Sequence, residues 1–186
     1  MTIPYLSVDP REVDAWRSRL AAASNKLRVG IAWAGRREHR NDQSRSMRLE
    51  VLVGALKAVE GIQFFSLQKG APSAELKNAA TPILDYTEEL HDFLDTATLI
   101  GALDLVISVD TAVVHLAGAL GKPVWMLNRF DTCWRWLMER EDTPWYPTLR
   151  LFRQPRFRDW EPVVHSVAAE LSRVVKERVA GARETR

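Results

Sequence analysis

The stretch DLVISVDTAVVHLAGALG, residues 104–121, decides the fold of this chain. Residues 104–110 are apolar on both faces, a pattern typical of a strand buried in a parallel sheet. From Thr111 the pattern becomes helical, and it ends at Gly121, a residue suited to the left-handed turn after a helix. The stretch therefore predicts a buried strand that leads directly into a helix.

Short apolar runs and helical patterns alternate on both sides of this stretch. Further strands are predicted in LRVGIAW (27–33), IQFFSL (62–67), PILDY (82–86), PVWML (123–127) and LRLF (149–152). Helices are predicted near residues 49–59, 74–80 and 90–103. Because parallel strands need crossover connections, which are usually helices, this order predicts an α/β fold: a Rossmann-like, doubly wound parallel sheet with helices on both faces.

Both ends of the chain are predicted to be helical. Asp9 and Pro10 are typical of a helix start, and residues 1–26 are expected to brace the domain. Residues 160–180 carry an apolar stripe at helical spacing, formed by Trp160, Val164, Val167, Leu171 and Val174. Since one core usually organises about 100–200 residues, residues 1–186 are expected to form a single domain.

Composition excludes several classes of protein. Apolar residues make up 46% of the chain and charged residues 27%, as in ordinary globular proteins and unlike disordered ones. No apolar run approaches the roughly 18 residues that cross a bilayer, and the amino end lacks a signal-peptide pattern. We therefore expect a cytoplasmic protein without a transmembrane segment. The single cysteine, Cys133, excludes an internal disulfide, and the scattered histidines give no support for a metal site, so no metal and no cofactor are expected.

The hexapeptide DTAVVH, residues 110–115, is the strongest candidate for a functional motif, because it joins the predicted strand to its helix. Ligands of doubly wound sheets lie beyond the carboxyl ends of the strands. There Thr111 is expected to cap the helix, while the free N–H groups of the first turn receive a phosphate oxygen. Asp110 is expected to accept hydroxyl groups, and His115 to donate near the same ligand. The alternative, given equal weight, is that Thr111 only caps the helix and His115 only packs on the sheet.

Residues 36–46, RREHRNDQSRS, contain no apolar residue and predict an exposed loop after the first strand. Gly35, just before this loop, allows close backbone approach, whereas Trp33 is expected to fill the core. Arg45 is a candidate for binding a diphosphate, and Lys69 at the end of the next strand is a weaker candidate of the same kind. For any single arginine of the loop, a solvated side chain is the competing interpretation.

Several motifs with known chemistry are missing from the chain. It has no G-x-G-x-x-G, no G-x-x-x-x-G-K-[ST] and no G-x-S-x-G, which disfavours dinucleotide oxidoreductases, P-loop enzymes and elbow-type hydrolases. The net charge of +2 is near neutral, and the aromatic residues cluster at 125–160, far along the chain from the arginine-rich loop. We therefore expect no nucleic-acid partner; that distant alternative predicts steeply salt-dependent binding.

Residues 92–125, DFLDTATLIGALDLVISVDTAVVHLAGALGKPVW, resemble the sugar-nucleotide-binding half of the heptosyltransferase-like glycosyltransferases, which carry a D-T-x-x-x-H-L-A-x-A-L-G-x-P-V pattern. With VGIAWAGRREHRNDQSRSM, FFSLQKG and WRWLMEREDTPWYPTLRLFRQ, the resemblance covers residues 27–165. It is especially similar to transferase regions that follow tetratricopeptide repeats in bacterial proteins. The resemblance implies the GT-B architecture, two Rossmann-like domains around a cleft, of which this chain holds one half.

The resemblance implies a role for each residue of the hexapeptide motif that matches the family pattern. Asp110 would contact hydroxyl groups of the donor sugar. Thr111 would hold the diphosphate together with the backbone N–H groups of Ala112 and Val113. His115 would line the same pocket.

Two further positions bear on the donor. Arg45 falls where related transferases place a basic residue on the phosphates. After Gly70 the chain departs from the family, because Pro72 stands where an acidic residue near the ribose is found, and Glu75 is a weak substitute. The resemblance therefore leaves the base of the donor open.

These features predict the donor-binding domain of a nucleotide-sugar-dependent glycosyltransferase. Negative charge that develops on the leaving diphosphate would meet fixed donors, and no metal would be required. The resemblance places the acceptor site and the catalytic base in an N-terminal domain or partner half, so the isolated chain is expected to bind a nucleotide diphosphate sugar but to turn over poorly or not at all. The alternative is a non-catalytic interaction module that docks a partner through the aromatic residues 130–146.

Overall fold

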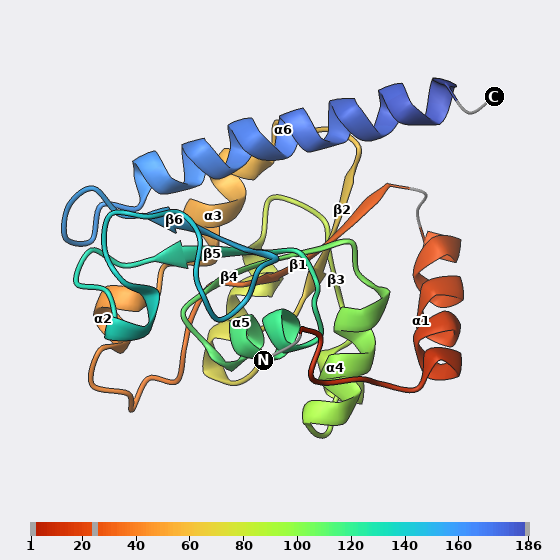
Figure 1. The fold of residues 1–186 in the computed structure, drawn as a ribbon, viewed down its shortest axis with the longest axis horizontal. Helices are drawn as coiled ribbons and strands as arrows, with labels where there is room; N and C mark the ends of the chain where they lie inside the picture. The colour runs from red at the N-terminus through yellow and green to blue at the C-terminus, as the bar shows by residue number, and fades with distance from the viewer. Residues whose placement is uncertain (1–2, 24–25, 185–186) are drawn as a thin grey trace.

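Six strands form one sheet at the centre of the protein (Figure 1). The structure is a computed structural model that describes residues 3–23 and 26–184. The strands are β1 (Leu27–Ala32), β2 (Ile62–Ser66), β3 (Ile83–Asp85), β4 (Leu105–Val109), β5 (Val124–Asn128) and β6 (Leu149–Arg153). They lie in the order β3-β2-β1-β4-β5-β6, and all neighbouring pairs are parallel. The predicted doubly wound, Rossmann-like α/β sheet is therefore confirmed.

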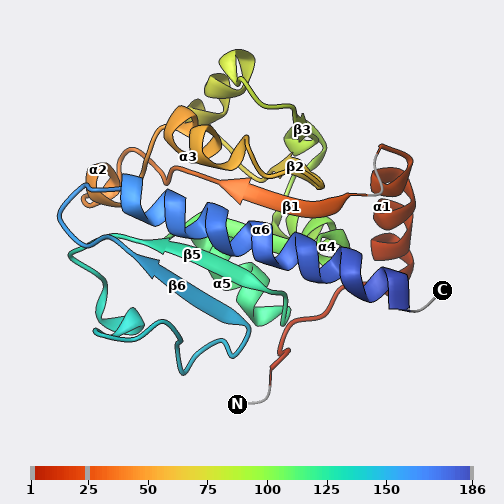
Figure 2. The same cartoon turned by 90° about the horizontal axis from the view of Figure 1, so that it is seen from above.

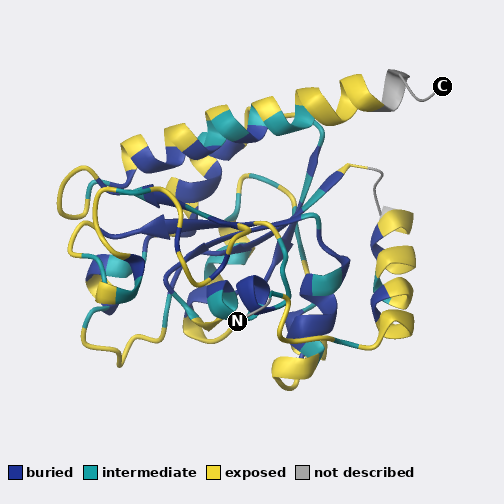
Figure 3. Ribbon diagram, viewed as in Figure 1, coloured by how far each residue is buried: buried dark blue, intermediate teal, exposed yellow. Residues whose placement is uncertain are grey.

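Helices cover both faces of this sheet. They are α1 (Pro10–Ala23), α2 (Asp42–Arg45), α3 (Leu49–Leu56), α4 (Phe93–Ala102), α5 (Ala112–Ala119) and α6 (Glu161–Glu184), with short 3₁₀ helices η1 (Ala71–Asn78), η2 (Thr87–Glu89) and η3 (Trp134–Trp136). Apolar residues of α3 and α6 share one core cluster with the sheet, and those of α1, α4 and α5 share the other. Figure 2 shows α6 crossing the sheet, and Figure 3 shows buried residues along the sides of the helices that face it.

The order of the strands reverses between β1 and β4. From β1 the chain adds β2 and β3 on one side and then returns to add β4, β5 and β6 on the other. Connections on the two sides of such a switch point diverge, which leaves a crevice at the carboxyl ends of the strands. The predicted junction lies at this point, because β4 ends at Val109 and α5 begins at Ala112.

The loop after β1 is more ordered than its composition predicted. Residues 36–46 were expected to form an exposed loop, but they contain α2, and Asp42 and Ser44 are buried. The Asp42 carboxylate accepts from Ser46 Oγ at 2.8 Å, and Nε of Arg45 lies 3.4 Å from the same oxygen. A polar segment can be buried where its groups bind one another, so the prediction of a fully exposed loop is wrong.

The predicted terminal helices differ in extent from α1 and α6. The brace was expected over residues 1–26, whereas α1 spans Pro10–Ala23, and residues 1–2 and 24–25 lie outside the described residues. The carboxyl-terminal helix, expected over 160–180, begins one residue later and continues to Glu184, while 185–186 are again outside the described part. Before α1, the N–H groups of Tyr5 and Leu6 donate to the carbonyl of Ala119 at 3.0 and 3.2 Å, which ties the first residues to the end of α5.

The segment between β5 and β6 runs beside the outer strand of the sheet. The N–H of Leu151 in β6 donates to the carbonyl of Glu141 at 2.6 Å. Arg153, at the end of the same strand, donates to the carbonyls of Arg140 and Trp136 at 2.8 and 2.6 Å. The segment therefore covers part of the open edge of β6.

Candidate functional site

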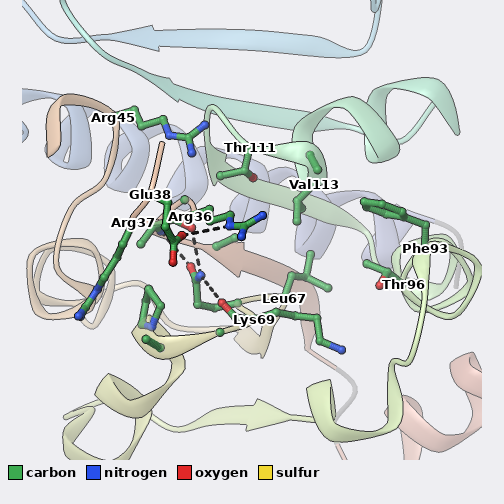
Figure 4. A pocket seen from close by; sticks show the side chains of 18 residues that line it. Arg36, Arg37, Glu38, Arg45, Leu67, Lys69, Phe93, Thr96, Thr111 and Val113 are labelled. Carbon is green, nitrogen blue, oxygen red and sulfur yellow. Dashed lines mark hydrogen bonds and ion pairs between the residues drawn. The ribbon is translucent and has the colours of Figure 1, made fainter. Parts of the chain in front are cut away.

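Two hollows adjoin at the carboxyl edge of the sheet, and Arg45, Thr111 and Ala112 line both of them. The larger hollow has a volume of about 660 Å³ and lies over the ends of β1 and β2 (Figure 4). The smaller hollow, about 320 Å³, lies toward the end of β5. Every residue predicted for the site lines one or both: Gly35, Arg45, Lys69, Thr111, Ala112 and Val113 the larger, and Arg45, Asp110, Thr111, Ala112 and His115 the smaller.

Arg45 stands between the two hollows, and Gly35 leaves room for its side chain. Nη1 of Arg45 donates to the backbone carbonyl of Asp110 at 2.9 Å, which joins the loop after β1 to the end of β4. A Cβ added at Gly35 would lie 2.5 Å from Cζ of Arg45, closer than real Cβ contacts come. The group that approaches Gly35 closely is thus a guanidinium of the same chain.

The first turn of α5 is open, but Thr111 does not cap it as predicted. Thr111 occupies the N-cap position in an extended conformation, and its hydroxyl pairs with Ser108 Oγ at 3.1 Å and not with a helix N–H. Among the described residues, no side chain or carbonyl accepts from the N–H groups of Ala112 and Val113, and Ala112 is exposed. These amides, with the positive end of the helix dipole behind them, are available to an anion.

His115 does more than pack on the sheet. Its Nδ1 is hydrogen-bonded to the Tyr146 hydroxyl at 3.0 Å, which in turn lies 3.3 Å from the Tyr5 hydroxyl. The imidazole stacks on Trp136 with ring centroids 5.2 Å apart. Burial lowers the pKa of His115 below its ordinary value, while the nearby Asp110 carboxylate opposes that shift. Burial thus favours the neutral form of the ring.

Lys69 lines the larger hollow, but its ammonium group is bound elsewhere. Its ammonium donates to the carbonyls of Thr87, at 3.1 Å, and Leu90. Figure 4 shows the side chain pointing away from Thr111. Glu75, the weak substitute for a ribose ligand, accepts from the N–H of Leu49 at 2.7 Å and so caps α3 instead. Pro72 does line the larger hollow.

Gln68 holds the floor of the larger hollow and was not singled out from the sequence. Its Oε1 accepts from the N–H groups of Trp33 and Ala34 at 3.0 and 2.9 Å, and its Nε2 donates to the carbonyl of Ala34 at 3.0 Å. The side chain thereby continues the pairing of β1 and β2 beyond the last strand residues. Trp33 is fully buried, as expected.

Two arginines of the smaller hollow, Arg129 and Arg135, were also missed. Both follow β5, whose carboxyl end lies at the same edge of the sheet as those of β1 and β4. The available signal is the end of the predicted strand just before Arg129, although the aromatic residues of the same segment favour a docking surface. The smaller hollow thus has three arginines and a single carboxylate, that of Asp110, in its lining.

Within the described ranges, no group of three or more histidine, cysteine or carboxylate side chains is placed to hold a metal ion. In the same residues no helix is both long and apolar enough to span a membrane.

Comparison with known proteins gives one family model, one relative and several solved structures that resemble this chain. Residues 90–128 match the family model for glycosyltransferase family 9 (heptosyltransferase). Protein FlbA of Caulobacter vibrioides is 29% identical over an alignment of 176 residues that covers 90% of this chain and 28% of FlbA. The chain therefore spans little more than a quarter of that relative.

Solved structures agree on the fold. ADP-heptose LPS heptosyltransferase II of E. coli matches 97% of this chain with a TM-score of 0.56 at 16% identity, and a family 9 glycosyltransferase of Veillonella parvula matches 97% with 0.57 at 11%. HepE of Anabaena, solved with UDP and glucose, matches 96% with 0.50 at 13%. This chain covers 55%, 52% and 53% of those three chains, about half of each. The protein has the Rossmann-like fold found in these glycosyltransferases, and its strand–helix junction matches the family 9 model.

Proposed function

We propose that residues 1–186 form the donor-binding domain of a nucleotide-sugar-dependent glycosyltransferase. The observation that supports this most is the convergence of the predicted site residues on two adjoining hollows at the switch point of the sheet. The match of residues 90–128 to the family 9 model supports the same substrate class.

In this proposal each part of the donor has a place that suits its chemistry. The diphosphate lies at the amides of Ala112 and Val113, beside the guanidinium of Arg45, where donors fixed before binding stabilise the charge on the leaving group. The nucleoside lies in the larger hollow, whose apolar wall includes Leu67, Pro72 and the exposed ring of Phe93 (Figure 4). An apolar wall with a few polar groups is typical of small-molecule sites.

The acceptor site and the catalytic base belong, in this proposal, to an N-terminal domain or partner half. The solved glycosyltransferases are nearly twice as long as the part that this chain matches. We therefore expect the chain alone to bind a nucleotide diphosphate sugar and to transfer the sugar slowly or not at all.

Replacement of Ala112 by proline tests the proposal with little damage to the fold. Ala112 is the first residue of α5, where proline is well accepted, and Thr111 before it is already extended (φ −135°, ψ 175°). Ala112→Pro removes one N–H that the helix does not use, whereas Ala112→Val adds similar bulk and keeps it. Loss of one hydrogen bond to a charged group should weaken nucleotide diphosphate binding about tenfold or more.

The measurement is calorimetric titration with UDP, ADP, GDP and CMP, and then with the corresponding nucleotide sugars. The wild type and Ala112→Val should bind at least one of these nucleotides alike, and Ala112→Pro should bind it more weakly. If nothing binds in the millimolar range, or if all three proteins bind equally, the diphosphate does not lie at these amides.

One observation favours the second candidate, an interaction module without catalysis. The segment between β5 and β6 exposes large apolar side chains: Trp134 (72% exposed), Met138 (76%), Phe130 (57%), Trp145 (49%) and Leu137 (42%). Sedimentation at rising concentration tests this candidate, since a docking surface of this kind predicts association that Trp134→Ser abolishes. A monomer at all concentrations that binds nucleotide would favour the donor-binding function.

A further inference from the structure

The smaller hollow holds more positive charge than that of Arg45, the guanidinium assigned above to the diphosphate. Its lining includes Arg129 and Arg135, which come from the segment after β5 and do not line the larger hollow. Asp110 is the single carboxylate in the lining. Arg45 and Arg129 have carboxylate neighbours outside the hollow, in Asp42 at 3.4 Å and Asp131 at 2.9 Å.

Arg135 carries the uncompensated charge. In the described part of the chain it forms no ion pair, and its Nε is buried without a hydrogen-bond partner. Its guanidinium lies 5.6 Å from the ring centre of Trp134, a contact that holds the group without using its N–H donors. Because a partly buried cation without a carboxylate partner is costly, an anion that enters the hollow and meets this guanidinium is favoured.

Arg129 is positioned before any ligand arrives. Its side chain is 10% exposed, and Nη1 donates both to Ser44 Oγ at 3.0 Å and to Asp131 at 2.9 Å. These bonds tie the end of β5 to α2 on the loop after β1. The guanidinium therefore loses little side-chain entropy when it binds an oxyanion.

His115 completes the donor set on the α5 side. Because Nδ1 is engaged by Tyr146, the other ring nitrogen is the one that remains for a ligand. The positive charge of Arg135 reaches the ring, since together with burial, the stronger cause, it lowers the pKa of His115. Arg135 and His115 both line the smaller hollow.

We propose that the smaller hollow is a second oxyanion seat, in which Arg135, with Arg129 and His115 beside it, binds a phosphoryl or carboxylate group of the donor. The inference rests on the proposed function, because the seat adjoins the amides of α5 through the shared residue Ala112. Two sources supply this chemistry: the second phosphoryl group of the diphosphate, or a carboxylate on the transferred sugar. Arginine forks bind both in pairs of hydrogen bonds.

Small anions that lack a nucleobase test this seat without requiring the identity of the nucleotide to be known. Amide NMR titrations of the whole chain with pyrophosphate, glucose 1-phosphate and glucuronic acid 1-phosphate would compare the wild type with Arg135→Gln. The matched control is Arg140→Gln, because Arg140 lies in the same segment, pairs with the exposed Asp142 and does not line either hollow. Arg135→Gln should weaken the affected probe about tenfold, and Arg140→Gln should not.

The probes separate the two sources. If Arg135→Gln loses affinity for pyrophosphate alone, the seat binds the second phosphoryl group. If it loses affinity for glucuronic acid 1-phosphate alone, with glucose 1-phosphate unchanged, the seat binds a sugar carboxylate. Equal affinities of Arg135→Gln and wild type for all three probes would overturn the seat, even where Ala112→Pro weakens nucleotide binding and the proposed function stands. If Arg135→Gln does not fold, Arg135→Lys, which keeps the charge but not the fork, should weaken the same probe to a smaller extent.

If no nucleotide binds but Arg135→Gln still weakens pyrophosphate binding, the hollow is an anion site, while its assignment to a donor falls with the proposed function. The two proposals are therefore distinguishable.

Discussion

The two faces of the sheet are covered by apolar side chains, whereas at the carboxyl ends of the strands a few polar side chains link neighbouring strands and loops. Val167 and Leu171 of α6 are fully buried against the strands. At the edge, Gln68 joins the ends of β1 and β2, Arg45 joins the loop after β1 to β4, and Arg129 joins that loop to β5. Burial depends on volume and tolerates similar residues, but each polar link depends on one pair of atoms.

This difference separates what stabilises the protein from what shapes its site. Truncating an apolar side chain buried on a face of the sheet should lower the free energy of unfolding. Replacing a polar side chain at the carboxyl edge should weaken ligand binding more than it lowers stability. Three comparisons, each with its own control, test this contrast, in decreasing order of expected effect on the free energy of unfolding.

The largest effect is expected on the covered face. Leu171→Ala should lower the free energy of unfolding by about 2–5 kcal/mol, because it leaves a cavity between α6 and the sheet. The control is Val179→Ala on the exposed part of the same helix, where Val179 is 48% exposed and the change should be within about 0.5 kcal/mol. Urea denaturation measures both. Similar losses would show that α6 is not held by the buried stripe.

A closer comparison is between two glycines, Gly30 within β1 and Gly35 in the loop that follows it. A Cβ at Gly30 would lie 2.5 Å from Cδ1 of Leu103 and 2.7 Å from Cδ1 of Leu67, both in the packed interior, so Gly30→Ala should cost about 1–3 kcal/mol. Gly35→Ala would push the guanidinium of Arg45 away from the carbonyl of Asp110, so it should cost less stability than Gly30→Ala and weaken anion binding instead. Denaturation and titration with pyrophosphate separate the two. A Gly35→Ala protein with unchanged binding would contradict the role given to Arg45.

The smallest effect is expected from pH at His115. Burial lowers the pKa of this histidine in the folded protein, so the unfolded chain binds the proton more readily. Stability is therefore fully present above the ordinary histidine pKa of about 6.5 and is lost as the pH falls below it. Denaturation between pH 7.5 and pH 5 should show a smaller loss for His115→Gln than for the wild type, and His165→Gln, on the surface of α6, should follow the wild type. If stability fell equally with pH in all three proteins, His115 would not be the group responsible for the loss.

The sequence predicted the faces better than the edge, and the reason is physical. Apolar spacing reports burial directly, so β4, α5 and the stripe of α6 were recognised, and every predicted site residue lies at the expected edge. A polar side chain instead takes whichever partner the fold brings near. The carbonyl of Leu90 that binds Lys69 lies in a connection beyond β3, and Ser108, which pairs with Thr111, is inside a strand. The spacing of residues along the chain therefore does not predict which hydrogen-bond partner a polar side chain takes.

The cover on β6 has a consequence for how the protein behaves in concentrated solution. An outer strand with unpaired backbone groups can recruit a strand from another molecule and so begin aggregation. Here the carbonyl of Glu141 already occupies the N–H of Leu151, and the side chain of Arg153 holds the covering segment in place. The segment that carries Arg135 and the exposed Trp134 and Trp145 thus also takes one N–H of the outer strand β6 out of reach of a strand from another molecule.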